Sequence, residues 1–97
     1  MEVVITEDAS EDIAEGYEFY EEQAVGLGAD FASFIMSELY SLTKLAGIHE
    51  VHFQKYHRKI SNRFPFAIFY TVENEVIWIY AILDTRRDPE WISERLN

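Results

Sequence analysis

Two apolar runs separated by three polar residues constrain the fold more than any other feature of the sequence. The first run is FPFAIFYTV at 64–72 and the second is VIWIYAIL at 76–83. β-Branched and aromatic residues favour strands, and a short polar link that contains Asn favours a tight turn. The pattern therefore predicts an antiparallel hairpin with a two-residue turn at Asn74 and Glu75.

The position of this turn determines which side chains share a face of the hairpin. Because side chains alternate along a strand, we expect one apolar face that packs on helices. The cross-strand pairs expected on that face are Val72–Ile77, Tyr70–Ile79, Ile68–Ala81 and Phe66–Leu83. The opposite face is mixed and aromatic, which makes it the candidate surface for a ligand or partner; it carries Ala67, Phe69, Thr71, Trp78, Tyr80, Ile82 and Asp84.

The first half of the chain predicts a strand and two amphipathic helices. EVVIT at 2–6 is a β-branched run. Helical spacing of apolar residues predicts a helix over 8–24, with Asp8 and Glu11 as a capping box at its start. The residues of this stripe are Ala9, Ile13, Tyr17, Tyr20 and Ala24. GLG at 26–28 breaks the pattern, and a second stripe from Phe31 to Leu45 predicts a helix over 29–46 that Gly47 ends.

The remaining elements complete a single α+β domain over residues 1–97. The stretch around FQKYHRKI, at 53–60, is compatible with a strand. Asp88 as N-cap and Pro89 at the first helical position predict a last helix through about Leu96. The order β-α-α-β-β-β-α predicts an N-terminal strand and a two-helix hairpin packed on one face of a small, mainly antiparallel sheet, followed by a short C-terminal helix.

Composition and charge narrow the possible functions. The 97 residues include no cysteine, which excludes thiolate metal sites and fits a reducing cytoplasm. No apolar run is long enough to span a membrane. The net charge of -10 argues against general affinity for nucleic acid. The charge is uneven: residues 1–50 have a net charge of -11 and residues 51–97 have a net charge of +1.

Two long stretches of the sequence resemble the RelE/ParE superfamily. They are EDIAEGYEFYEEQAVGLGADF at 11–31 and RFPFAIFYTVENEVIWIYAILDTRRDPEWISERL at 63–96. The most specific parts are the FPFAIFY strand, the strand that ends AILDTRRDP, and the GLGADF helix junction. Members of this family are small toxins of type II toxin–antitoxin modules, often labelled plasmid-stabilisation proteins. The resemblance implies a RelE/ParE-like toxin domain that is neutralised by an antitoxin encoded beside it.

The family divides by target, and the resemblance implies candidate residues for both branches. The RelE-like branch cleaves mRNA on the ribosome with basic residues on the open face of the sheet and often a late tyrosine. The ParE-like branch is associated with poisoning DNA gyrase and lacks that full catalytic set. The family's basic positions correspond here to Arg58 or Lys59, Arg63, and Arg86 with Arg87.

Two departures from the RelE-like pattern favour the gyrase-directed reading. The segment after Arg87 has Trp91 as its only aromatic residue, so the late tyrosine has no match. Asp84 stands where many relatives carry a histidine. An mRNA endoribonuclease, or a relative that has lost toxicity and only binds a partner, are the alternatives.

Metal-independent RNA cleavage needs cations on the phosphate and groups that transfer protons. Arg58, Arg63 and Arg86 are the candidate catalytic cations, because a guanidinium binds phosphate bidentately. His57 or Lys59 is the candidate proton carrier. The alternative is that these basic residues only balance nearby acids and protect a sheet edge from aggregation.

Arg86 and Arg87 are expected to have different roles, because neighbours on an extended chain point to opposite faces. Continued alternation past Asp84 places Arg86 on the aromatic face and leaves Arg87 to support the last helix or an acid beside it. The candidate residues for partner binding are Trp78, Tyr80, Phe69, Lys59 and Arg87.

No cofactor or metal is expected, and the partner is expected to be basic. His49, His52 and His57 lack the spacing and the accompanying ligands of a zinc site. The acidic run EGYEFYEE at 15–22 reads as the solvated face of the first helix. An acidic toxin should prefer an antitoxin segment that places apolar anchors and basic side chains against the first two helices.

Overall fold

The computed structural model describes residues 1–45, 51–52 and 55–97. Its elements are β1 (Glu2–Ile5), α1 (Glu7–Gln23), α2 (Leu27–Leu45), β2 (Val51–His52), β3 (Tyr56–Ile60), β4 (Phe66–Glu73), β5 (Val76–Asp84) and α3 (Pro89–Leu96). The five strands form one sheet in the order β1-β5-β4-β3-β2. β1 is parallel to β5 and the other neighbours are antiparallel. The predicted α+β class is therefore confirmed, and the predicted end of the second helix at Gly47 lies outside the described residues.

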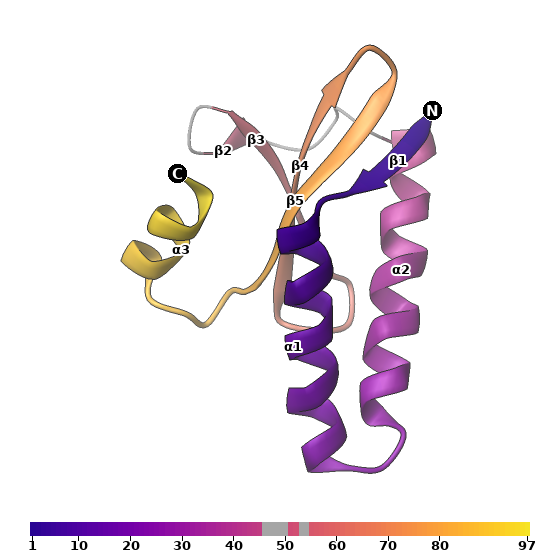
Figure 1. Cartoon of the computed structure of the whole chain (residues 1–97), viewed down its shortest axis with the longest axis vertical. Helices are drawn as coiled ribbons and strands as arrows, with labels where there is room; N and C mark the ends of the chain where they lie inside the picture. The colour runs from indigo at the N-terminus through magenta and orange to yellow at the C-terminus, as the bar shows by residue number, and fades with distance from the viewer. Residues whose placement is uncertain (46–50, 53–54) are drawn as a thin grey trace.

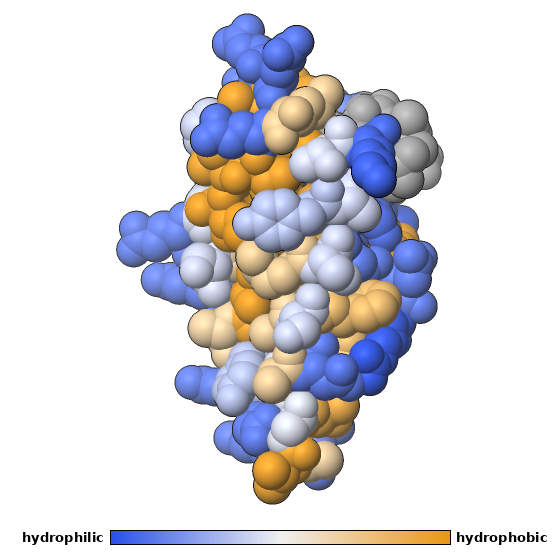
Figure 2. Space-filling view, turned by 90° about the vertical axis from the view of Figure 1, so that its right-hand side faces the viewer, coloured by the Kyte–Doolittle hydropathy of each residue, from blue (hydrophilic) through white to orange (hydrophobic). Residues whose placement is uncertain are grey.

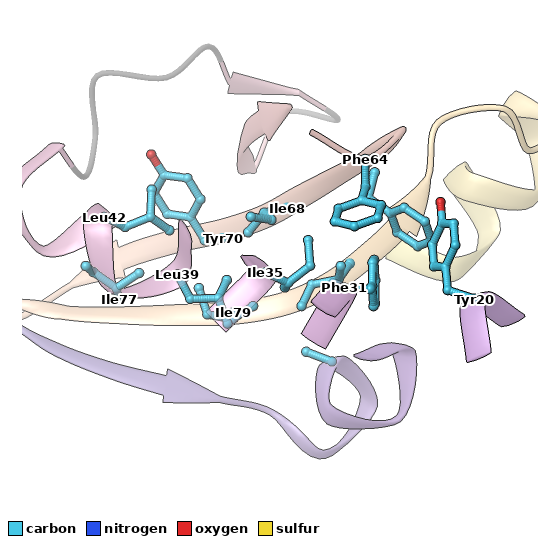
Figure 3. Packing of buried hydrophobic residues seen from close by; sticks show 13 residues of the cluster. Tyr20, Phe31, Ile35, Leu39, Leu42, Phe64, Ile68, Tyr70, Ile77 and Ile79 are labelled. Atoms are coloured by element: carbon cyan, nitrogen blue, oxygen red, sulfur yellow. The ribbon is translucent and has the colours of Figure 1, made fainter. Parts of the chain in front are cut away.

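The sheet separates the helical hairpin from the C-terminal helix. The α1–α2 hairpin lies on one side of the sheet and α3 lies on the other (Figure 1). The main core lies between the hairpin and the sheet, where Phe31, Ile35 and Leu39 of α2 meet Ile68 of β4 and Ile79 of β5 (Figure 3). All five of these side chains are fully buried, so this layer supplies most of the apolar burial that stabilises so small a domain.

The first helix begins differently from the prediction. Its N-cap is Thr6, whose hydroxyl accepts a hydrogen bond from the Ala9 amide at 3.2 Å. The same hydroxyl donates to the Ile79 carbonyl, and this bond ties the start of α1 to β5. The expected capping box of Asp8 and Glu11 was wrong, because Asp8 already lies inside the helix.

The buried stripe of α1 is also rotated from the predicted one. Residues buried on α1 are Ala9, Asp12, Gly16 and Tyr20, whereas Tyr17 is 40% exposed. Position 16 requires a glycine, because a Cβ there would lie 2.4 Å from the ring of Phe31. The spacing of apolar residues does not reveal this buried stripe, because two of its members are Asp12 and Gly16.

The turn that joins β4 and β5 is the predicted one. Asn74 and Glu75 have φ values of 51° and 63°, as a type I′ turn requires. The predicted pairs Val72–Ile77 and Tyr70–Ile79 are present.

Beyond Tyr70 the register shifts by one residue, so the other two predicted pairs were wrong. Ile68 pairs with Ile82, and Phe66 pairs with Asp84. Tyr80 is the extra residue of a β-bulge, because Phe69 pairs with Ala81 and Tyr70 with Ile79.

The bulge reverses the faces of the last part of β5. Ile82 joins the core under the helical hairpin, whereas Ala81 and Leu83 join the cluster under α3. Asp84, two residues after Ile82, lies on the side of the hairpin as well. The expected face of these four side chains was wrong for this single reason.

Candidate functional site: a basic notch beside the C-terminal helix

The sheet face opposite the hairpin is largely covered by α3. Trp91, Ile92 and Leu96 of α3 pack on a buried cluster of sheet residues that includes Phe69 and Leu83. The Tyr56 hydroxyl donates to the Leu96 carbonyl at 3.1 Å and fixes the end of the helix. Phe69 is only 2% exposed, so it forms the floor under α3 and is not an open contact surface as the sequence suggested.

Arg58 and Arg87 line one cavity at the edge of this covered face. The cavity has a volume of about 180 Å³ and its lining residues are Arg58, Ala67, Phe69, Thr85, Arg87, Pro89 and Ile92. Side chains alternate along β3, so Arg58 shares a face with Tyr56, which lies in the cluster under α3. His57 and Lys59 point to the opposite face. The Arg87 guanidinium lies 4.2 Å from the centroid of the Trp91 ring.

These two arginines differ from Lys59, Arg63, Arg86 and Arg95, each of which pairs with a carboxylate. Neither takes part in an ion pair with any residue in the described parts of the chain. In a protein of net charge -10, two arginines that meet at one cavity and form no ion pair with a described residue make a candidate anion-binding site. We call this site, defined by Arg58 and Arg87, the basic notch. The charge of Arg87 also helps to lower the pKa of Asp84.

Arg86 has the structural role that the sequence analysis gave to Arg87. Its guanidinium donates to both carboxylate oxygens of Asp84, at 3.0 and 2.7 Å, and its amide donates to the same carboxylate. These hydrogen bonds hold the pKa of Asp84 below its usual range and raise the pKa of Arg86. The charges of both residues influence Tyr20 of α1, so the pair lies on the hairpin side of the sheet. The expected position of Arg86 on the aromatic face was wrong because the bulge at Tyr80 reverses the alternation.

Arg63 and Lys59 are also engaged in the helical layer. Arg63 forms a bidentate ion pair with Asp30 of α2, which raises the pKa of Arg63, and it lies over the rings of Phe34 and Phe64. Lys59 is 9% exposed and its Nζ lies 2.8 Å from Oε2 of Glu38. Lys59 therefore lies on the side of the sheet opposite the basic notch.

The structure does not gather the three candidate catalytic arginines. Arg58 lies at the basic notch, whereas Arg63 and Arg86 each have a carboxylate partner elsewhere. The lining of the basic notch contains no histidine, lysine, tyrosine or carboxylate that would transfer a proton.

Four of the residues proposed for partner binding separate into two groups, an exposed one and a buried one. Trp78 and Tyr80 are partly exposed, as a contact surface requires. The Tyr80 ring meets the Tyr56 ring edge-on at 5.4 Å, and Lys55 Nζ lies 5.7 Å from its centroid. Phe69 and Lys59 are buried and support the fold.

Asp12 is a polar residue that the sequence analysis missed. Its carboxylate accepts from the Ile82 amide at 3.0 Å and from Arg95 of α3 at 2.7 Å. Burial raises the pKa of Asp12, although these hydrogen bonds act in the opposite direction. The signal in the sequence is an acid three residues after Ala9 on the stripe that faces the sheet.

The described residues show no cluster of histidines. His57 stacks on Tyr70 with ring centroids 5.1 Å apart, His49 lies outside the described residues, and the side chain of His52 is not described. In the described ranges no three metal-ligating side chains come together. The described helices also include none with the length and apolarity to cross a membrane.

Comparison with known proteins places the fold. No protein-family model and no curated protein matched the sequence. A chain of the solved structure "Chromosomal ParDE TA system from P. aeruginosa" is similar, with a TM-score of 0.74 and 20% sequence identity. The match covers 84% of this chain and 92% of that chain. The element order, the sheet and this match together identify the fold as RelE/ParE-like.

Proposed function

We propose that the protein is the toxin of a type II toxin–antitoxin module that acts by binding a protein target, with DNA gyrase as the first candidate. The observation that carries this proposal is the lining of the basic notch: two arginines that form no ion pair with a described residue, and no side chain that transfers protons. Such a site binds an anionic group well and is poorly equipped for general acid–base chemistry. The fold shared with a chain of a ParDE system supports the same class.

The proposal includes the partner and the setting. A cognate antitoxin encoded beside the gene neutralises the toxin, and the module stabilises the plasmid or replicon that carries it. Both the gyrase and the antitoxin are cytoplasmic, which gives the expected location of the protein.

Expression of the chain alone from a tightly regulated promoter tests the proposal. We expect growth arrest, relieved by co-expression of the neighbouring reading frame. If gyrase is the target, purified protein inhibits supercoiling of relaxed plasmid, and the inhibition is reduced by Arg58→Ala. Normal growth at an expression level that yields folded protein would reject the toxin assignment.

The alternative of a ribosome-dependent mRNA endoribonuclease is favoured by one observation, the convergence of Arg58 and Arg87 on one anion-sized cavity. RNA-end mapping during growth arrest separates the two. New mRNA 5′ ends that depend on translation and vanish with Arg58→Ala would establish the nuclease. Arrest without such ends would leave the gyrase-directed function.

A further inference from the structure

The basic notch has an apolar floor beneath its two arginines. Apart from the arginines and the Thr85 side chain, its lining is hydrocarbon: Ala67, Phe69, Pro89 and Ile92. Ala67 and Phe69 are each 2% exposed, so this floor belongs to the packed layer between the sheet and α3. A group bound here would have its charge at the guanidinium groups and its carbon atoms against the floor. The cavity therefore suits an anion that carries a hydrocarbon chain.

Hydrogen bonds fix the backbone that carries Arg87. The Thr85 amide and the Thr85 hydroxyl both donate to the Pro65 carbonyl, at 2.8 and 3.2 Å. The Arg87 amide donates to the Asp84 carbonyl at 3.2 Å. Because the hydroxyl proton of Thr85 is already used, the side-chain donors left in the cavity for an anion are the guanidinium groups of Arg58 and Arg87.

Trp91 determines the direction of the Arg87 side chain. The guanidinium of Arg87 lies 4.2 Å from the centroid of the Trp91 ring, and Trp91 is itself packed against the cluster under α3. Arg87 also borders a second cavity, which contains the carboxylates of Glu15 and Asp84. Without the ring, Arg87 could turn toward these carboxylates. Cation–π attraction to Trp91 therefore keeps the guanidinium available to the basic notch.

The acids next to Arg87 in the sequence are already engaged. The Asp84 carboxylate accepts two hydrogen bonds from the Arg86 guanidinium. The Asp88 carboxylate accepts from the Glu90 amide as the N-cap of α3. Neither carboxylate forms an ion pair with an arginine of the basic notch. The two guanidinium groups are therefore available to an anion from another molecule.

We propose that the basic notch binds the side-chain carboxylate of a Glu residue on a protein target, and that Trp91 positions Arg87 to receive it. A guanidinium binds a planar carboxylate through two parallel hydrogen bonds, and the methylene groups of Glu fit the apolar floor. A nucleic-acid phosphate lacks this hydrocarbon chain, and the net charge of -10 repels a polyanion. The proposal rests on the proposed function in one respect, that the carboxylate belongs to the target.

Titration of the whole chain with small anions tests the chemistry of the site. Butanoate reproduces the carboxylate and the carbon chain of Glu, and acetate lacks two of its methylene groups. Each buried methylene tightens binding by roughly fourfold, so butanoate should bind about tenfold more tightly than acetate. Butanamide, the uncharged analogue, should not bind. Nitrogen-edited NMR of the arginine Nε–H and tryptophan Nε1–H groups measures these affinities.

Inorganic phosphate, titrated at the same ionic strength, is the competing probe. We expect it to bind less tightly than butanoate. The proposal is overturned if phosphate binds more tightly than butanoate, if acetate and butanoate bind equally, or if no carboxylate shifts the arginine signals.

Substitutions locate the binding site on the molecule. Arg58→Gln and Arg87→Gln should each weaken butanoate binding by at least about tenfold, because each removes a charged donor. Lys44→Gln is the matched control, since it removes the same charge from an exposed position of α2. Figure 2 shows this α2 side of the molecule, where hydrophilic and apolar side chains are interspersed. Equal weakening by all three variants would mean a general effect of charge and would overturn the proposal.

Trp91→Leu and Trp91→Phe test the positioning role. Leu keeps an apolar side chain under α3 but has no ring, so butanoate binding should weaken by about two- to fivefold. Phe keeps a ring beneath the guanidinium and should restore most of the affinity. Thermal unfolding measures the stability of both variants. A lower Tm with unchanged affinity would show that Trp91 only supports the fold and would overturn its positioning role.

Two short peptides distinguish the possible sources of the carboxylate. Both have the same apolar residues; one has a central Glu and an amidated end, and the other has Gln and a free C-terminal carboxylate. Binding of the first supports the proposal. Binding of the second alone would assign the basic notch to a chain terminus, and tighter binding of a 5′-phosphorylated oligoribonucleotide would assign it to nucleic acid; either result overturns the proposal.

Growth assays separate this proposal from the proposed function. Binding of butanoate and the Glu peptide by a protein that causes no growth arrest would reject the toxin function and support the carboxylate site. Growth arrest by a protein whose basic notch binds no carboxylate would support the toxin function and overturn the carboxylate site.

Discussion

Asp12 is the residue at which α1, β5 and α3 meet. One carboxylate oxygen accepts from the Ile82 amide of β5 and from the Arg95 guanidinium of α3. We expect Asp12→Ala to lower the free energy of unfolding by about 2 kcal/mol, because it leaves a buried amide without an acceptor. Urea denaturation measures this change. Glu11→Ala, at the exposed neighbouring position, is the control and should change stability by less than about 0.5 kcal/mol.

The two adjacent arginines after β5 should have opposite functional and structural effects. Arg87→Ala and Arg58→Ala should abolish growth arrest while the proteins remain folded, since both side chains line the basic notch. Arg86→Ala should leave growth arrest intact, because its guanidinium is engaged with Asp84. Growth curves with protein levels checked by immunoblot provide the measurement. Loss of arrest with Arg86→Ala and not with Arg87→Ala would contradict this assignment.

The Asp84–Arg86 pair predicts a specific pH dependence of stability. The pKa of Asp84 is lowered in the folded protein, chiefly by hydrogen bonding from Arg86. The pair therefore stabilises the fold fully above the unfolded-state pKa of about 3.9, and this stabilisation is lost as the pH falls through the lower folded-state pKa. Denaturant unfolding should show wild type more stable than Asp84→Asn at pH 7, with the difference shrinking below pH 4. A difference that grows on acidification would contradict this.

The close approach of α1 and α2 requires a glycine at position 28. A Cβ at Gly28 would lie 2.5 Å from the Tyr17 carbonyl oxygen and 2.9 Å from Glu21. A glycine-to-alanine change inside a helix normally stabilises by about 1 kcal/mol. Here we expect Gly28→Ala to destabilise by about 1–3 kcal/mol, because backbone must move. Thermal unfolding of Gly28→Ala tests the sign, and Ala29→Gly, exposed in the same helix, gives the ordinary propensity cost for comparison.

The elements that were predicted correctly have local causes. Asn74 and Glu75 form the turn that a polar link between two strands requires, and Asp88 caps the helix that Pro89 begins. Apolar periodicity and cap residues act within a few positions of the chain, so these elements can be predicted from the sequence alone.

The predictions failed where the position of a residue depends on a partner that is distant in the sequence. The bulge at Tyr80 depends on how β5 meets both β4 and the Asp12 carboxylate, and no spacing rule contains that information. From the sequence, Lys59 is likewise expected to be a surface cation. In the structure it is paired with Glu38 of α2. The candidate site was predicted in part: Arg58 and Arg87 stay candidates, whereas the partners of Arg63 and Arg86 lie across the tertiary structure or beyond the bulge.

The charge of the whole molecule predicts an unusual response to salt. α1 carries eight carboxylates and no basic residue, and among the described ion pairs only that of Asp12 involves this helix. Mutual repulsion of these acids opposes folding and is screened by added salt. We expect the Tm to rise between 10 mM and 0.5 M NaCl by about 4–8 °C, which corresponds to about 1 kcal/mol for a domain of this size. Calorimetry at several NaCl concentrations measures the rise, and the Glu11→Lys, Glu18→Lys double variant should show a smaller one. A Tm that falls with salt would mean that the surface ion pairs outweigh the repulsion within α1.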